Sequence, residues 1–247
     1  ACIAAGAVLF GIQRVPSVAR LEEYGKTVRA TGYRKTLHVS ALPNRATEEI
    51  RGAVASIFDM ECESLPNYLN LTLTPSNPIL HTTRLRTIFE DYTPQKHYDS
   101  LPLFYEEWSD ESSHLLFKCD AEVQKLCRAM ETFDLSQVRS LKEHYESDTP
   151  QALTRKIRSI AGFKGLTTPS VKDADGYMPD LNSRYFTADF SYGLVIIKQI
   201  ADIYGVDVPN ISSTLEWYDN ISVSSSAFSF AEYGIKSRED FERFYSL

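Results

Sequence analysis

Two polar segments, about a hundred residues apart, contain the residue types that acid–base chemistry needs. The first is TPSNPILHTTR, residues 74–84, in which two prolines favour extended backbone just before a predicted helix. This arrangement places Asn77, His81 and Thr82 near the helix N-terminus, whose positive end favours a neutral imidazole. A neutral histidine in such a place suits proton transfer near neutral pH.

The second segment is MPDLNSRYFTADFSYGL, residues 178–194, which leads into an apolar helical stretch. Arg184, Asp189 and Tyr192 fall at helical spacing near the start of that helix, where the helix dipole stabilises a carboxylate. A carboxylate that orients an imidazole fixes its tautomer and stabilises the protonated form. His81 and Asp189 are therefore a candidate acid/base pair, with Tyr192 as a candidate pocket residue.

Each of these residues also has an ordinary structural interpretation. Taken alone, His81 is a helix N-terminal residue satisfied by local backbone, and Asp189 is equally a carboxylate on a solvated first turn. Arg184 is more often a surface or interdomain ion pair than a substrate clamp. The aromatic residues Tyr105 and Trp108 are expected in the core, as aromatics on helices usually are.

The elements that must position these residues differ between the two ends of the chain. The first 45 or so residues are rich in strand signals, with the apolar run AVLFGI and an alternating stretch that turns at Thr31-Gly32. We predict three short strands there, followed by the helix TEEIRGAVASIF with Thr47 as its cap. One αβ unit is the expected result.

From about Leu65 onward, apolar residues recur with helical periodicity between Pro, Gly and Ser/Asp interruptions, which predicts a mostly helical domain. The sequence thus predicts an α+β chain, with an α/β part at its beginning and a mostly helical part after it. The predicted helices cover roughly 77–90, 102–131, 138–146, 149–161, 183–204, 210–219 and 237–246.

Composition excludes several classes of protein. The formal charge of −7 with scattered lysines and arginines argues against nucleic acid, and no apolar run is long enough to cross a bilayer. The four cysteines form no CxxC pair and no HxxxH or HExxH occurs, so we expect no metal site. So few cysteines are expected to be reduced in a cytoplasmic protein.

A nucleotide-binding fingerprint is missing from this sequence. None of the eleven glycines forms GxGxxG, GxGxxA or GxxxxGK, the patterns that let backbone N–H groups approach a pyrophosphate. The sequence also begins at Ala1 without an initiator methionine, and its first ten residues read as a core strand. We therefore expect a fragment that lacks most of a nucleotide-binding domain and is inactive alone.

The order and spacing of three motifs carry a family resemblance. NPILHT at 77–82 is followed by RYFTADFSYGL at 184–194 and by ADIYGVDVP at 201–209. This pattern, together with the leading stretch VLFGIQRVPSVARLEEYGKTVRATGYRK, resembles the octopine/nopaline (opine) dehydrogenase family. The resemblance implies a truncated Rossmann-type remnant over 1–70 and an all-α catalytic domain of the 6-phosphogluconate-dehydrogenase C-terminal type over 71–247.

The resemblance also implies a reaction. Members of that family condense the amino group of an amino acid with a 2-oxo acid and reduce the imine with NAD(P)H, so NAD or NADP is the implied cofactor. His81 would be the general acid/base, and Asp189 would orient it. Asn77, Thr82, Arg184 and Tyr192 would bind substrate, Arg184 through a carboxylate. The implied partners are these small molecules, and a homodimer is compatible.

Two other functions stay open from the sequence. Another two-domain dehydrogenase, acting on a 2-hydroxy acid or sugar acid, would use a lysine as acid/base, and no lysine lies near His81 in the motif. A non-catalytic helical domain for dimerisation or ligand binding is the third candidate. A separation of His81 from Asp189 by more than a side-chain length would favour that third interpretation.

Overall fold

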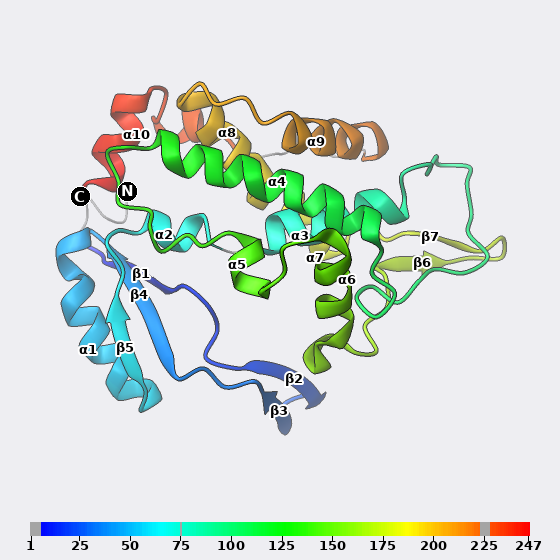
Figure 1. The fold of residues 1–247 in the computed structure, drawn as a ribbon, viewed down its shortest axis with the longest axis horizontal. Coiled ribbons are helices and arrows are strands. Elements are labelled where there is room, and N and C mark those ends of the chain that lie inside the picture. The colour runs from blue at the N-terminus through cyan, green and yellow to red at the C-terminus, as the bar shows by residue number, and fades with distance from the viewer. Residues whose placement is uncertain (1–5, 75, 223–227) are drawn as a thin grey trace. The chain divides into compact units, whose positions relative to one another are not determined.

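The computed structural model describes residues 6–74, 76–222 and 228–247. The chain forms two compact units (Figure 1). The first comprises residues up to 75 together with 130–138 and 237–247, and the second comprises 76–129 and 139–236. Within the described ranges, no helix is both long and apolar enough to cross a membrane.

The first unit is built on two small sheets, ordered β1–β4–β5 and β2–β3. β4 is central in the larger sheet, because it pairs antiparallel with β1 and parallel with β5. The elements of this unit are β1 (Leu9–Ile12), β2 (Val18–Glu23), β3 (Thr27–Thr31), β4 (Thr36–Leu42), α1 (Thr47–Phe58), β5 (Glu61–Ser64), α2 (Leu69–Thr72) and α10 (Arg238–Tyr245).

The predicted αβ unit is the β4–α1–β5 crossover. Two parallel neighbouring strands need a connection of this kind, and α1 provides it. The alternation in β4 turns Leu37 and Val39 inward, each with no exposed surface, and they pack with Val54 of α1 and Cys62 of β5. The α/β character expected for the beginning of the chain is therefore confirmed.

Two local predictions in this unit are wrong. The chain forms four strands before α1 rather than three, because β2 and β3 close a hairpin of their own before β4 begins. Thr47 is the first helical residue rather than the cap, and Ala46 at the cap position makes no side-chain hydrogen bond. The Thr47 hydroxyl instead accepts from the Ala41 N–H at 3.1 Å and donates to Asn44 Oδ1 at 3.1 Å.

Segments distant in sequence complete the first unit. Asn67 and Asn70 each donate from Nδ2 to the Asp134 carbonyl at 2.9 Å, which ties residues 130–138 to α2. At the C-terminal end, the Leu247 carbonyl accepts from the Asn44 N–H at 3.0 Å. The chain therefore leaves this unit after residue 75 and returns to it twice, whereas the sequence had assigned everything after residue 70 to the helical domain.

The second unit is mainly helical and is organised around α3. Every residue of α3 from Ile79 to Leu85 is buried, and this helix packs on α4, α9 and a π-helical turn. The elements are α3 (Asn77–Ile88), α4 (Asp110–Ala129), α5 (Leu141–Tyr145), α6 (Pro150–Ser159), β6 (Ser170–Lys172), β7 (Tyr177–Pro179), α7 (Arg184–Thr187), the π-turn (Asp189–Leu194), α8 (Val195–Ile203) and α9 (Pro209–Ile221).

The helical character expected of this part of the chain is confirmed, but it is not all-helical, because β6 and β7 pair as an antiparallel hairpin that the sequence did not predict. One helix is also much shorter than expected. The helix predicted over 102–131 begins only at Asp110. The residues before Asp110 pair with a distant segment and therefore do not form a helix. Leu103 forms an isolated β-bridge with Thr167, and the Phe104 N–H donates to the Leu166 carbonyl at 2.8 Å. The non-helical loop that results at 103–109 lies against α3 through Arg84 and becomes part of the site described below.

Two buried carboxylates of α4 cap neighbouring helices. Asp120 Oδ2 accepts from the Leu141 N–H at the start of α5, at 2.9 Å. Glu122 accepts from the backbone N–H groups of Asn210 and Ile211 at the start of α9, at 2.8 and 2.9 Å. Because first-turn N–H groups lack partners within their own helix, these carboxylates fix where α5 and α9 begin against α4.

Candidate active site

The site begins with α3, whose first turn is set by the sequence. Pro78 stands in that turn, where a proline loses no helical hydrogen bond. His81 follows one turn later and is only 3% exposed. Burial of a histidine requires partners for its ring nitrogens.

Asp189 provides the first partner. Its Oδ2 lies 2.7 Å from His81 Nδ1, although 108 residues separate the two. Asp189 opens the π-turn, in which the N–H groups of Tyr192 and Gly193 both donate to the Ala188 carbonyl. Such wider turns within helices occur frequently at functional sites. With the carboxylate on Nδ1, the tautomer that protonates Nδ1 is favoured and Nε2 is left to exchange a proton.

Tyr105 provides the second partner, which sequence reasoning did not assign. Its hydroxyl lies 2.7 Å from His81 Nε2, and its ring stacks on Phe163 at a centroid distance of 4.1 Å. Burial raises the pKa of Tyr105, and the neighbouring Tyr185 raises it further. The phenol therefore stays protonated and donates to Nε2. Periodicity correctly placed Tyr105 in the core but gave no signal for its hydroxyl contact.

Arg84 holds the loop that carries Tyr105. Its guanidinium donates to the Phe104 carbonyl at 3.0 Å and to the Glu107 carbonyl at 2.7 Å, and it lies 5.4 Å from the centroid of Trp108. Burial lowers the pKa of Arg84 to about 10. A guanidinium with that pKa remains charged at neutral pH, so these carbonyls receive charge-assisted hydrogen bonds.

Aromatic rings enclose the imidazole of His81. The Tyr185 ring centroid lies 4.2 Å from that of His81, and Phe104 lies 5.7 Å away and stacks on Tyr185. These rings keep bulk water from the imidazole and strengthen its electrostatic contacts. Arg184 then places its guanidinium carbon 5.5 Å from the centroid of Tyr185, on the exposed side of the group.

The other sequence-predicted residues have mixed positions. Asn77 is exposed at the first position of α3. Thr82 is fully buried, and its hydroxyl donates to the Pro78 carbonyl at 2.5 Å, which leaves it little capacity for a substrate. Tyr192 is 56% exposed with its ring 6.5 Å from that of Phe228, so the structure does not bring it to His81.

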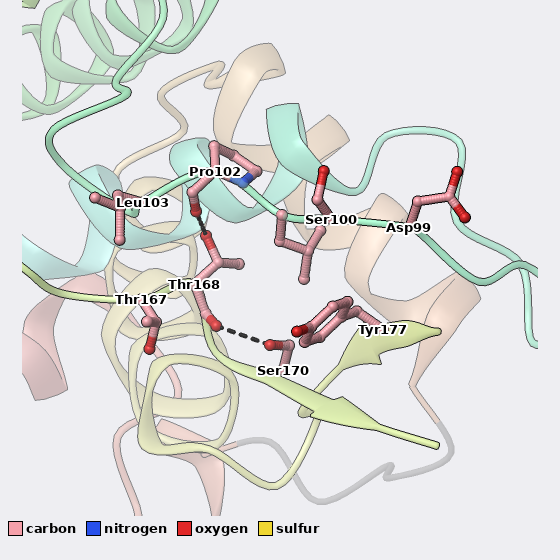
Figure 2. A pocket seen from close by; sticks show the side chains of 9 residues that line it. Asp99, Ser100, Pro102, Leu103, Thr167, Thr168, Ser170 and Tyr177 are labelled. Atoms are coloured by element: carbon pink, nitrogen blue, oxygen red, sulfur yellow. Dashed lines mark hydrogen bonds between the residues drawn. The ribbon is translucent and has the colours of Figure 1, made fainter. Parts of the chain in front are cut away.

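A cavity of about 340 Å³ lies elsewhere in the second unit. Figure 2 shows its walls, formed on one side by the segment through Ser100 and Pro102 and on the other by Thr168 and the β6–β7 residues Ser170 and Tyr177. Thr168 donates to the Pro102 carbonyl at 2.7 Å and so joins the two walls. The cavity is lined by neither His81 nor Asp189, and we assign it no part in proton transfer.

One group in the described part of the chain has the residue types of a metal site. The ligand atoms of His97, Asp173 and Asp175 lie within 4.8 Å of one another. However, Asp173 already accepts from His97 Nε2 at 3.0 Å and from the N–H groups of Asp175 and Gly176. The two backbone bonds close the turn of the β6–β7 hairpin, and the contact with His97 fixes that turn to residues outside it, so hydrogen bonds account for the cluster.

Comparison with known proteins identifies the family of the chain. Residues 64–222 match the family model described as NAD/NADP octopine/nopaline dehydrogenase, alpha-helical domain. This chain belongs to that family. The predicted resemblance and the α+β fold with its helical domain are thereby confirmed.

Individual proteins named as opine dehydrogenases of several kinds are similar to this chain in sequence or in fold. Tauropine dehydrogenase of Arabella iricolor is 30% identical over 220 residues, which are 82% of this chain and 55% of that protein. Octopine dehydrogenase of Pecten maximus is 25% identical over 87% of this chain and 56% of its own length. A solved octopine dehydrogenase with NADH and L-arginine has a TM-score of 0.77 at 20% identity, covering 96% of this chain and 65% of that one. The chain spans about half the length of the curated relatives it matches.

Proposed function

We propose that the protein is an opine-type dehydrogenase, which condenses the amino group of an amino acid with a 2-oxo acid and reduces the imine with NADH or NADPH. The observation that carries the proposal is the 2.7 Å contact between His81 Nδ1 and Asp189 Oδ2, within the region that matches the family model. The relatives named as tauropine and octopine dehydrogenases support the reaction class.

In this proposal His81 exchanges the proton of the reaction at Nε2. Asp189 holds Nδ1–H and stabilises the imidazolium once Nε2 is protonated. The hydroxyl oxygen of Tyr105 lies 2.7 Å from Nε2, which is the distance at which a substrate oxygen would exchange a proton with this nitrogen. A substrate carbonyl oxygen that displaced the Tyr105 hydroxyl from this position would be polarised by Nε2–H once His81 is protonated.

The remaining substrate contacts come from the exposed side of the site. Arg184 is exposed beside Tyr185, and its planar guanidinium suits two hydrogen bonds to a carboxylate. Both condensing substrates carry a carboxylate. Asn77, exposed at the start of α3, provides an amide within the same unit. Arg184 is therefore proposed as the carboxylate clamp, with Asn77 as a second polar contact.

The described residues do not fit the pyrophosphate of the nicotinamide cofactor. In the β4–α1–β5 crossover the connection to the helix, residues 43–46, contains no glycine. The first turn of α1 carries Glu48 and Glu49, which would repel phosphate at the position where a helix N-terminus normally attracts it. When bound, the cofactor would supply the hydride that reduces the imine.

The rival interpretations lose support. A non-catalytic helical domain was expected to hold His81 and Asp189 apart, and they lie in hydrogen-bond contact. A lysine acid/base would have to occupy the position that His81 holds between Asp189 and Tyr105. We also propose a cytoplasmic protein, because the described cysteines Cys62, Cys119 and Cys127 are free thiols.

The decisive experiment uses the protein as its gene encodes it. NADH and NADPH oxidation is followed with pyruvate and a panel of amino acids, for the wild type, His81→Gln and His114→Gln. His114 is an exposed histidine of α4 and serves as the matched control. We expect His81→Gln to lose about 10²- to 10⁴-fold in turnover, the usual range for a general acid/base, and the control to be unchanged. Undiminished turnover of His81→Gln contradicts the assignment.

A further inference from the structure

Gly193 occupies a helical position that does not require glycine for its backbone. It lies in the π-turn just before α8, and its φ is outside the left-handed region, unlike those of Gly205 and Gly234. In such a position alanine is better than glycine by about 0.8–1 kcal/mol. The reason for glycine here must therefore lie in the space around it.

That space is filled by the first turn of α3. A Cβ atom on Gly193 would lie 2.8 Å from Pro78 Cγ and 2.9 Å from Pro78 Cβ, whereas ordinary van der Waals contact begins at about 3.4 Å. The proline ring is fixed to its own backbone and has no rotamer that would move it away. The two helical segments thus touch here without room for a methyl group.

This contact is one helical turn away from the His81–Asp189 hydrogen bond. Pro78 precedes His81 by three residues on α3, and Gly193 follows Asp189 by four on the facing segment, so each pair shares a helix face. We infer that Gly193 is a positioning residue, which lets the π-turn approach α3 closely enough for Asp189 to reach His81. Its effect on catalysis rests on the function proposed above.

The geometry indicates the size of the effect. Restoring a 3.4 Å contact from 2.8 Å requires the segments to separate by about 0.6 Å. The same displacement applied to the 2.7 Å contact between His81 Nδ1 and Asp189 Oδ2 gives about 3.3 Å, beyond the usual length of a charge-assisted hydrogen bond. A single methyl group is therefore expected to break the pair without removing either partner.

The test compares Gly193→Ala with the double variant Gly193→Ala/Pro78→Gly, which removes both clashing ring carbons. Gly52→Ala is the control, because Gly52 lies within α1 and nothing is found within 4 Å of a Cβ placed there. The readout on the 247-residue chain is the NMR signal of the His81 Nδ1 proton, shifted downfield and protected from exchange by its carboxylate partner. Thermal unfolding is recorded in parallel.

We expect Gly193→Ala to lose the protected proton, the double variant to regain it and Gly52→Ala to keep it. A Gly193→Ala chain that retains the signal overturns the inference. If Gly193→Ala does not fold, a folded double variant with the signal supports the inference. A double variant that folds without the signal, or does not fold, overturns it.

The NMR result is independent of turnover. In the gene-encoded protein, Gly193→Ala is further expected to lower kcat with little change in KM, and the double variant to recover part of kcat. Absence of opine dehydrogenase activity in the wild type would contradict the proposed function alone. The His81 proton signal would still decide whether Gly193 positions the pair.

Discussion

Asp120 offers a prediction whose size follows directly from the structure. This carboxyl group is 6% exposed in α4 and caps α5 through the Leu141 N–H at 2.9 Å. Burial raises the pKa of Asp120 from 3.8 to about 6, against the opposing effect of the Leu141 hydrogen bond. The folded chain therefore binds this proton more tightly than the unfolded chain does.

The sign of the pH dependence follows from linkage. A group with a raised pKa in the folded state stabilises the fold below pH 4, and that contribution is lost as pH rises through about 6. At 1.36 kcal/mol per pKa unit, the loss is about 3 kcal/mol. Asp120→Asn keeps an acceptor for the Leu141 N–H but carries no charge at any pH.

The assay is urea unfolding of the wild type and Asp120→Asn from pH 4 to pH 7. The free energy of unfolding of the variant minus that of the wild type should increase by about 2.4 kcal/mol over this range, somewhat less than the full shift because the unfolded carboxyl group is already partly ionised at pH 4. Because both proteins contain the other carboxylates, subtracting one free energy of unfolding from the other at each pH cancels the contribution of their titration. A difference that is constant or falls with pH refutes the reasoning, as does a ¹³C titration of the Asp120 carboxyl with its midpoint near 4.

Two further predictions concern the candidate active site of the gene-encoded protein. Asp189→Asn should lower kcat by about 10²-fold or more while the fold is retained, because the amide no longer stabilises an imidazolium. Steady-state kinetics measures kcat, and a thermal melt verifies that the variant is folded. A kcat within twofold of the wild-type value would count against the prediction. Tyr105→Phe keeps the ring stacking on Phe163 but removes the hydroxyl at Nε2. The loss of one hydrogen bond worth about 1.5 kcal/mol should reduce kcat about tenfold and leave KM nearly unchanged. An altered KM with a normal kcat would instead indicate that Tyr105 binds substrate.

Some helix beginnings were predictable, because the helices expected from about 77, 149 and 237 begin within one residue of those positions, whereas the one expected from 102 begins at Asp110. Thr149 accepts from the Ala152 N–H with Pro150 at the first helical position of α6, and Ser237 accepts from the Asp240 N–H at the start of α10. Caps of this kind involve residues three apart, so the necessary information is local. The same local reasoning failed at Thr47, whose hydroxyl is occupied by the end of β4.

The site was predictable only in part. His81 and Asp189 were identified from two motifs, and the structure brings them into contact. Tyr105 and Arg84 were not assigned to the site. The sequence does not show whether a buried tyrosine hydroxyl will contact a histidine, or whether a buried guanidinium will bind the loop beside it. Tyr192 has the helical spacing of a site residue but lies on the exposed side of its segment.

By itself, the sequence determined the family, the order of an αβ unit and a helical domain, and the two segments that could carry acid–base chemistry. These depend on short-range patterns of apolar spacing, prolines and motif residues. The tertiary structure alone decided that Tyr105 meets Nε2, that Arg84 secures its loop, and that Gly193 adjoins Pro78. Those contacts join residues 20 or more positions apart, and their formation depends on how closely helices pack, which no local preference specifies.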